Sequence, residues 1–204
     1  MMPQVWPPGA GWIEVVTGCM FSGKTSELIH RLERAQLARS TVAVFKPARD
    51  VRYGRQHIVT HSNHRFPSIA VDKAAEILQL AAPYEVVGVD EAQFFDLDLV
   101  RVCNRLADEG KRVVVAGLDQ DFRGEPFEPI PQLMAVAEYV TKKLAVCTVC
   151  GLPADRSQRL VPADERFLLG ARGSYEARCR RHWSAEVVPV MQGDLPLGEP
   201  DPVG

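Results

Sequence analysis

The sequence predicts an α/β fold: a parallel sheet flanked by helices, followed by a small second subdomain. Short apolar, β-branched runs alternate along the chain with segments whose apolar residues recur at helical spacing. Within each run the apolar residues are consecutive rather than alternating, which is typical of strands covered on both faces. A third observation predicts the subdomain, because long apolar runs become rare and cysteines cluster after Leu144.

The individual elements follow from these patterns in order. Strands are expected at residues 12–17, 41–45, 86–90 and 111–118, and helices at 24–39, 72–81 and 96–109. Asp72 is the expected N-cap of the second helix, and the polar segment 47–66 predicts irregular structure. The expected organisation is a flexible N-terminus at 1–10, an α/β domain at 11–146, a subdomain at 147–190 and a disordered Pro/Gly-rich tail at 191–204.

Composition and charge exclude several classes of protein. The 204 residues include 24 Lys and Arg against 26 Asp and Glu, a formal charge of -2, whereas a dedicated duplex-DNA binder carries a basic excess. No stretch reaches the roughly 20 apolar residues of a membrane helix, and the Pro-rich start does not resemble a signal peptide. We therefore expect a cytoplasmic protein with no nucleic-acid or membrane partner.

Residues 18–25 carry a phosphate-binding motif. They read Gly-Cys-Met-Phe-Ser-Gly-Lys-Thr and match G-x-x-x-x-G-K-[ST] at every fixed position, between a predicted strand and a predicted helix. In such a loop the glycines let successive backbone N–H groups converge on phosphate oxygens. Lys24 is expected to reach the β- and γ-phosphates, and the Thr25 hydroxyl is expected to bind Mg²⁺. The motif predicts a P-loop domain of the RecA-like kind.

Two acidic residues end the next predicted buried strand. Asp90 follows four strand residues and is expected to face the metal of a P-loop site, while Glu91 projects beyond the strand end. There Glu91 polarises water in an ATPase or accepts the proton of a substrate hydroxyl in a kinase. The alternative is that Glu91 only stabilises a helix N-terminus.

The cysteines predict a metal site. Five are present, and an odd number with a Cys-x-x-Cys pair does not indicate a secreted disulfide framework. Cys147-x-x-Cys150 and Cys179-x-x-His182 are two chelating pairs, which together would make a closed, tetrahedral and therefore structural zinc site. The alternatives are a redox pair or two unrelated turns. Cys19, inside the phosphate loop, is either a redox sensor or a tolerated small side chain.

Together these motifs resemble the type II thymidine kinases, the cytosolic cellular type. The resemblance rests on Met-Phe-Ser-Gly-Lys in the P-loop, Asp90-Glu91-Ala-Gln93-Phe94-Phe95, the two zinc pairs and several further segments, in order, from about residue 11 to 190. Those segments are Asp50-Val-Arg52-Tyr53, Thr60-His61, Leu118-Asp119-Gln-Asp-Phe122, Pro126-Phe127, and Gly170 with Tyr175.

The resemblance implies ATP- and Mg²⁺-dependent phosphorylation of thymidine, and of deoxyuridine, at the 5′-hydroxyl. It makes Glu91 the general base. The implied ATP site comprises Gly18, Cys19, Met20, Phe21, Ser22, Gly23, Lys24, Thr25, Asp50, Arg52, Asp90 and Gln93. The implied nucleoside site comprises Met20, Phe94, Leu118, Phe122, Phe127, a lasso-like loop of Arg166, Phe167, Leu168, Leu169 and Gly170, and Tyr175. Phe122 and Phe127 have the alternative of being ordinary core residues.

The family further implies a homotetramer, feedback inhibition by dTTP and a lasso tied down by structural zinc. Two departures from the family pattern stand out: Cys19 occupies a position that is often Pro or Ser, and Arg172-Gly-Ser stands where many relatives carry an acidic residue. Two other classes stay open at this point. One is a RecA-like ATPase acting on DNA, and the other is a zinc-ribbon interaction module with a vestigial P-loop.

Overall fold

A six-stranded, all-parallel sheet forms the centre of the molecule. The computed structural model describes residues 9–50, 57–59, 65–162 and 173–187. The strand order is β5-β2-β6-β7-β1-β8, and every neighbouring pair runs parallel. The bounds are β1 (Trp12–Thr17), β2 (Val42–Pro47), β5 (Ile69–Val71), β6 (Val86–Val89), β7 (Arg112–Gly117) and β8 (Tyr139–Lys142). The predicted α/β fold with a parallel sheet is thereby confirmed.

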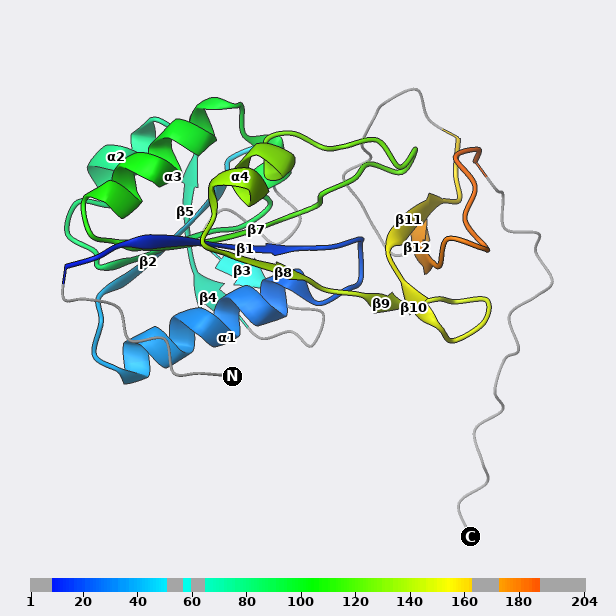
Figure 1. Cartoon of the computed structure of the whole chain (residues 1–204), viewed down its shortest axis with the longest axis horizontal. Coiled ribbons are helices and arrows are strands. Elements are labelled where there is room, and N and C mark those ends of the chain that lie inside the picture. The colour runs from blue at the N-terminus through cyan, green and yellow to red at the C-terminus, as the bar shows by residue number, and fades with distance from the viewer. Residues whose placement is uncertain (1–8, 51–56, 60–64, 163–172, 188–204) are drawn as a thin grey trace, which may run out of the picture.

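Helices cover both faces of this sheet (Figure 1). Helix α1 (Lys24–Leu37) packs on one face, and α2 (Glu76–Leu80), α3 (Asp98–Asp108) and α4 (Ile130–Val136) pack on the other. The strands read as continuous apolar runs for this reason. In β7, for example, Val113 and Val115 belong to the core under α3, whereas Val114 and Ala116 belong to the core under α1.

Several local expectations were wrong. Helix α1 ends at Leu37, and Arg39 beyond it takes a positive φ of 66°. Helix α2 begins at Glu76, so Asp72 is not its N-cap. The Glu76 carboxylate accepts the backbone N–H groups of Asp72 and Lys73 instead. Part of the segment expected to be irregular forms an antiparallel pair of strands, β3 (His57–Val59) and β4 (Arg65–Pro67).

The C-terminal region, defined here as the described residues 145–162 and 173–187, contains only short antiparallel pairs. Strand β9 (Ala145–Val146) pairs with β10 (Pro153–Ala154), and β11 (Arg156–Arg159) pairs with β12 (Tyr175–Arg178). Figure 1 shows this region beyond the ends toward which β1 and β8 run. It therefore lies next to the edge of the sheet at which the P-loop begins.

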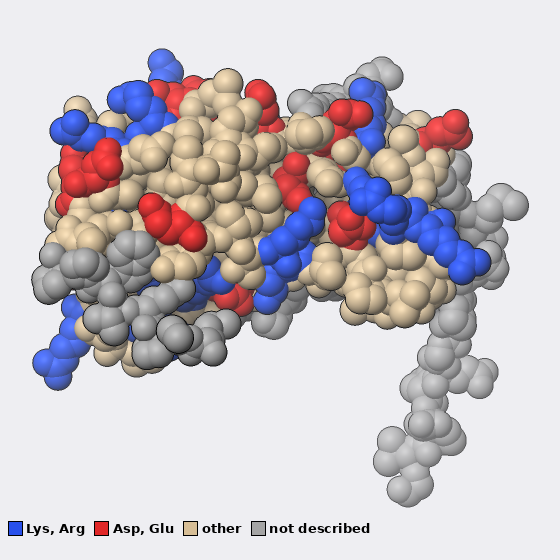
Figure 2. All heavy atoms as spheres, in the orientation of Figure 1, with Lys and Arg blue, Asp and Glu red and all other residues tan. Residues whose placement is uncertain are grey.

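The surface gives two further observations. In the described part of the chain, no helix has the length and apolarity needed to cross a bilayer. Figure 2 shows Lys and Arg side chains interspersed with Asp and Glu over the visible face, rather than gathered into one basic surface. A mixed distribution of this kind does not provide the continuous positive stripe of a nucleic-acid binder on that face.

Candidate active site and metal centre

The carboxyl ends of the parallel strands bring the predicted catalytic residues to one edge of the sheet. The P-loop follows β1, Asp90 and Glu91 follow β6, and Asp119 lies just beyond β7. Since β6, β7 and β1 are neighbours in the sheet, these three connections lie side by side. Open parallel sheets bind their ligands in the crevice outside this edge.

Two glycines allow the P-loop to turn back toward helix α1. Gly18 has φ 136°, and a Cβ atom there would lie 2.1 Å from the backbone oxygen of Lys143 on the neighbouring chain segment. Gly23 has φ 81° and is the N-cap of α1. Both backbone conformations favour glycine. The loop therefore leads directly into a helix N-terminus, whose free N–H groups and dipole favour phosphate.

Lys24 lies at the centre of this edge. Its Nζ donates to the backbone oxygen of Cys19 at 2.7 Å, and Ser22 Oγ donates to the same oxygen at 2.8 Å. Burial lowers the pKa of Lys24, and the negative charges of Glu91, Asp90 and Asp119 among others counteract that effect. The ammonium group is thus close to acidic groups from two strands as well as to the loop that would hold the phosphates.

Thr25 and Asp90 form a pair suited to a hard cation. The Thr25 hydroxyl lies 3.2 and 3.3 Å from the two carboxylate oxygens of Asp90, which is a buried residue. Hydroxyl, carboxylate and water oxygens are the ligands that Mg²⁺ prefers. These two residues therefore fit the magnesium role expected of them.

Glu91 has an unusual backbone conformation, and Gln93 binds its side chain. Glu91 has φ 50° and ψ 41°, a left-handed conformation that is uncommon for a residue other than glycine and that occurs at functional sites. Gln93 Nε2 donates to Glu91 Oε2 at 2.6 Å, while Gln93 Oε1 accepts the backbone N–H of Leu118 at 3.0 Å. Gln93 thus links the carboxylate of Glu91 to the end of β7.

Cys19 does not have the environment of a reactive thiol. Its side chain is 3% exposed, and Sγ donates to the backbone oxygen of Ala154 at 3.4 Å. Burial raises the pKa of this thiol, although the nearby Lys24 opposes the shift. A reactive cysteine needs an exposed thiolate. Cys19 therefore acts as a small packing residue between the P-loop and the C-terminal region, and the redox alternative is not favoured.

Asp119 is a buried carboxylate to which the sequence reasoning gave no role in the site. Its Oδ2 lies 2.6 Å from Lys142 Nζ, while Oδ1 has no hydrogen-bond partner among the described residues. Asp119 follows β7 and Lys142 ends β8, and β1 lies between those strands. The ion pair therefore crosses the end of β1, where the P-loop starts. Only the strand order, which the sequence does not reveal, could have shown this.

The residues expected to line the nucleoside site form two groups in the structure. Phe94 and Phe127 meet edge to face with ring centroids 6.5 Å apart, and the guanidinium of Arg49 lies 4.7 Å from the Phe94 ring. Phe122 and Tyr175 form the second group, because the guanidinium of Arg159 contacts both of their rings.

The remaining predicted residues are placed as follows. The backbone N–H of Met20 donates to Ser157 Oγ in the C-terminal region at 3.0 Å, so Ser157 joins the P-loop to β11. Asp50 is buried just after β2. Arg52 and the lasso loop of residues 166–170 lie outside the described residues.

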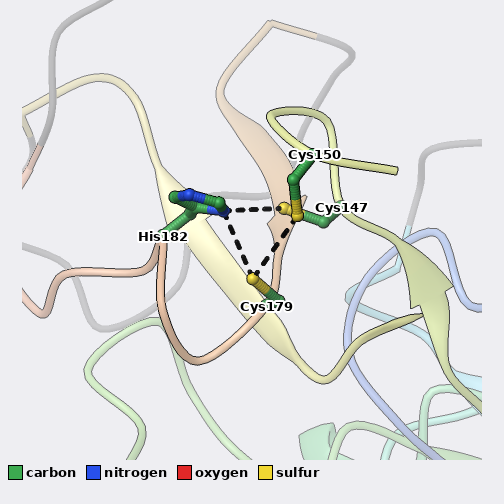
Figure 3. Close-up of side chains that lie close together, drawn as sticks. All are labelled: Cys147, Cys150, Cys179 and His182. Carbon is green, nitrogen blue, oxygen red and sulfur yellow. Dashed lines mark hydrogen bonds between the residues drawn. The ribbon is translucent and has the colours of Figure 1, made fainter. Parts of the chain in front are cut away.

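The metal centre brings its four predicted ligands together (Figure 3). The ligand atoms of Cys147, Cys150, Cys179 and His182 all lie within 4.8 Å of one another. His182 Nδ1 is 3.3 Å from Cys179 Sγ and 3.8 Å from Cys147 Sγ, and Cys150 Sγ is 3.8 Å from Cys179 Sγ. Four converging donors of the Cys₃His type match a closed, tetrahedral zinc site.

Electrostatics at Cys147 also suit a metal ligand. Burial opposes ionisation, but hydrogen bonds from the backbone of Cys179, Val149 and Cys150 and from His182 lower the pKa of its thiol to about 6. The thiolate is the form of cysteine that binds metal. The backbone around this turn thus favours the ligating form at neutral pH, and the residues fit a zinc ion.

The chain matches a family model described as thymidine kinase over residues 11–183. A thymidine kinase of a Rhodothermus species is 60% identical over 171 residues, 84% of this chain and 80% of that protein. A thymidine kinase of Bdellovibrio bacteriovorus is 53% identical over 178 residues, 87% of each chain. Among solved structures, the flagellar accessory protein FlaH of Methanocaldococcus jannaschii aligns with 70% of this chain and 74% of its own, at a TM-score of 0.47 and 11% identity. On the family match and the two sequence relatives, the chain belongs to the thymidine kinase family.

Proposed function

We propose that this protein transfers the γ-phosphoryl group of ATP to the 5′-hydroxyl of thymidine. Family membership supplies the substrate, and the position of Glu91 carries the chemistry. Its carboxylate is held by Gln93 at the sheet edge that also holds Lys24, Thr25 and Asp90. The comparisons do not favour the alternative of a RecA-like ATPase acting on DNA.

Binding of the ATP phosphates and stabilisation of their charge are assigned to the P-loop. Phosphoryl transfer passes through a loose transition state with charge on the γ-phosphoryl oxygens, so catalysis depends on positioning and charge stabilisation. The backbone N–H groups of residues 18–25 and the Lys24 ammonium would surround the phosphates, with Arg52 beside them. Thr25 and Asp90 would hold Mg²⁺, which neutralises phosphate charge when it is bound.

Glu91 is assigned the role of the base that accepts the proton of the 5′-hydroxyl. In a loose transition state the attacking hydroxyl loses its proton late, so an ordinary carboxylate is sufficient as a base. The hydrogen bond from Gln93 to Glu91 Oε2 holds this carboxylate at the sheet edge. Met20, Phe94, Leu118, Phe122, Phe127 and Tyr175, with the lasso loop of residues 166–170, are the proposed contacts of the nucleoside.

The test is to incubate the purified protein with ATP, Mg²⁺ and, in turn, thymidine, deoxyuridine, deoxycytidine, deoxyadenosine or deoxyguanosine, and to measure monophosphate formation. We expect thymidine monophosphate, a lower yield from other pyrimidines and none from purines. In Glu91→Gln, kcat should fall by about 10²–10⁴-fold, the usual contribution of a general base. Thymidine binding, measured by calorimetry, should be retained. DNA-stimulated ATP hydrolysis without any nucleoside product, or a Glu91→Gln variant that keeps most of its kcat, would contradict the proposal.

We also infer a structural zinc ion in the Cys₃His site, a cytoplasmic location, a homotetrameric state and inhibition by dTTP. The zinc assignment rests on the four converging donors, and the other three rest on family membership. Metal analysis, sedimentation and a dTTP titration of the phosphorylation assay test the zinc, the tetramer and the inhibition separately.

A further inference from the structure

Arg159 is a charged residue in a fully buried position. It ends β11, stands opposite Tyr175 in the pairing with β12, and is 0% exposed. A guanidinium group stays charged at any physiological pH, and burying it is costly unless its N–H groups are hydrogen-bonded. A residue kept in such a place therefore has contacts that compensate for its desolvation.

Those contacts join the two parts of the molecule. The Arg159 guanidinium carbon lies 3.8 Å from the ring centroid of Phe122, which belongs to the loop after β7, and 5.4 Å from that of Tyr175. Its Nε and Nη2 donate to Tyr175 Oη at 3.2 and 2.6 Å. Only a planar group with several donors can stack on one ring and hydrogen-bond a second side chain at the same time.

Phe122 is held by the C-terminal region at a second point. Its backbone oxygen accepts the indole N–H of Trp183 at 3.2 Å, and Trp183 directly follows the metal ligand His182. Arg123 also lies over the Phe122 ring, at 5.1 Å, but it is exposed and belongs to the same loop as Phe122. Among the described residues, the contact with the buried Arg159 is thus the one that joins this ring to β11 and β12.

We propose that Arg159 is a positioning residue of the nucleoside pocket, which fixes the Phe122 ring relative to the Tyr175 hydroxyl. The inference rests on the proposed function, because that function places Phe122 and Tyr175 against the nucleoside. The contacts given above are separate from the hydrogen bond between Gln93 and Glu91 that holds the catalytic carboxylate. Arg159 therefore controls nucleoside affinity and not the phosphoryl-transfer step.

The primary test is Arg159→Lys, which keeps the charge but removes the plane and the paired donors. We expect the KM for thymidine to rise about tenfold, in the range of a lost cation–π contact and hydrogen bond. The kcat, the KM for ATP and the zinc content should stay within about twofold. Thymidine affinity measured by calorimetry without ATP should fall by the same factor as the KM rises.

Tyr175→Phe provides a second variant that does not alter the buried charge. It removes only the oxygen that accepts both hydrogen bonds from Arg159, so it tests the proposal even if Arg159→Lys does not fold. In the double variant the two effects should be clearly less than additive, because both substitutions break the same contact. Arg123→Lys is the matched control, since it changes an arginine over the same ring without touching Tyr175, and its KM should not change.

Results that contradict the positioning role of Arg159 can be distinguished from results that contradict the proposed function. A zinc-loaded Arg159→Lys protein with an unchanged KM for thymidine, or with a lower kcat at constant KM, would overturn the positioning role and leave the proposed function intact. Additive effects in the double variant would also overturn it. A wild-type protein that does not phosphorylate thymidine would overturn the proposed function, and the role of Arg159 with it.

Discussion

The α/β domain and the C-terminal region are held together by different forces. The α/β domain has two clusters of fully buried aliphatic and aromatic side chains, one on each face of its sheet. The buried cluster of the C-terminal region consists of three alanines and Cys147 together with Cys19 of the P-loop, and Cys179 packs against it. Cys147 and Cys179 belong to the candidate metal site. Leu160 and Tyr175 are buried, but three other large apolar side chains of this region, Val146, Val149 and Leu152, are exposed. The first region has a large hydrophobic core, whereas the second has a small buried cluster, hydrogen bonds and a candidate metal site.

This difference has a consequence for the proposed active site. The proposed catalytic and phosphate-binding residues that the structure describes come from the sheet edge, which the hydrophobic core supports. Ser157, Arg159 and Tyr175 come from the C-terminal region and contact the P-loop or the loop after β7. We therefore expect the geometry of the nucleoside pocket to depend on metal binding, and the phosphate site to depend on it much less.

The largest expected effect is that of removing a metal ligand. In Cys179→Ala the C-terminal region should lose its ordered structure, because metal binding contributes about 10–16 kcal/mol to the folding of small zinc sites. The α/β domain should stay folded. Metal analysis and thermal unfolding followed by circular dichroism check both parts. A variant with normal zinc content would exclude Cys179 as a ligand, and loss of the whole fold would remove the contrast between the two regions.

A substitution in the hydrophobic core should destabilise the α/β domain and leave the metal site unchanged, the opposite of what is expected for Cys179→Ala. Leu32 of α1 is fully buried and packs beside Gly88 of β6. Leu32→Ala should lower the free energy of unfolding of the α/β domain by about 2–5 kcal/mol, from lost burial and the remaining cavity. Denaturant unfolding measures this, with zinc content expected to stay normal. Val149→Ala is the control: Val149 is 52% exposed, so the change should stay within about 0.5 kcal/mol.

The smallest predicted effect concerns a charge network inside the α/β domain. Buried Glu14 of β1 accepts hydrogen bonds from Arg112 at 2.6 Å, Trp12 at 2.8 Å and Arg31 at 2.9 Å. Burial alone would raise the pKa of Glu14, but the hydrogen bonds and charges of these partners outweigh it and lower the pKa below 4.5. Glu14→Gln should therefore destabilise the protein by about 1–3 kcal/mol at neutral pH.

The pH dependence of the free energy of unfolding distinguishes a contribution of the Glu14 charge from an effect of the substitution on packing alone. A carboxylate whose pKa is lower in the folded state stabilises the protein above its unfolded pKa, and that stabilisation is lost as the pH falls through the folded pKa. The difference in free energy of unfolding between wild type and Glu14→Gln should thus be constant above about pH 5 and shrink at more acidic pH. A difference that stays constant down to pH 3 would contradict the assigned pKa shift.

The sequence was a good guide wherever local pattern and structure coincide. The strands that became β1, β6 and β7 are continuous apolar runs because both of their faces are buried. The P-loop, Asp90, Glu91 and the four metal-site residues could be proposed from the sequence because the chemistry expected of them requires a fixed spacing. Strand β8 and helix α4 were missed: β8 alternates half-buried and exposed residues at the sheet edge, and α4 carries a proline in its first turn.

Other residues could not be found from local pattern. Strand β11 reads Arg-Ser-Gln-Arg, and all four residues are buried, yet a polar run of this kind predicts an exposed turn. The residues that contact it, Phe122 and Tyr175 among them, are distant in sequence, and the tertiary fold brings them to this strand. The ion pair of Asp119 and Lys142 likewise depends on β8 pairing with β1. Contacts between distant segments were the part that only the structure revealed.

Amide hydrogen exchange of the zinc-loaded and chelator-treated protein tests the division between the two regions most directly. On metal removal we expect the amides of β11 and β12 to lose their protection, while those of β1, β6 and β7 keep it. Thymidine affinity should fall, and ATP affinity should change little. Unchanged protection in β11 and β12, or an equal loss in the central sheet strands, would contradict the account.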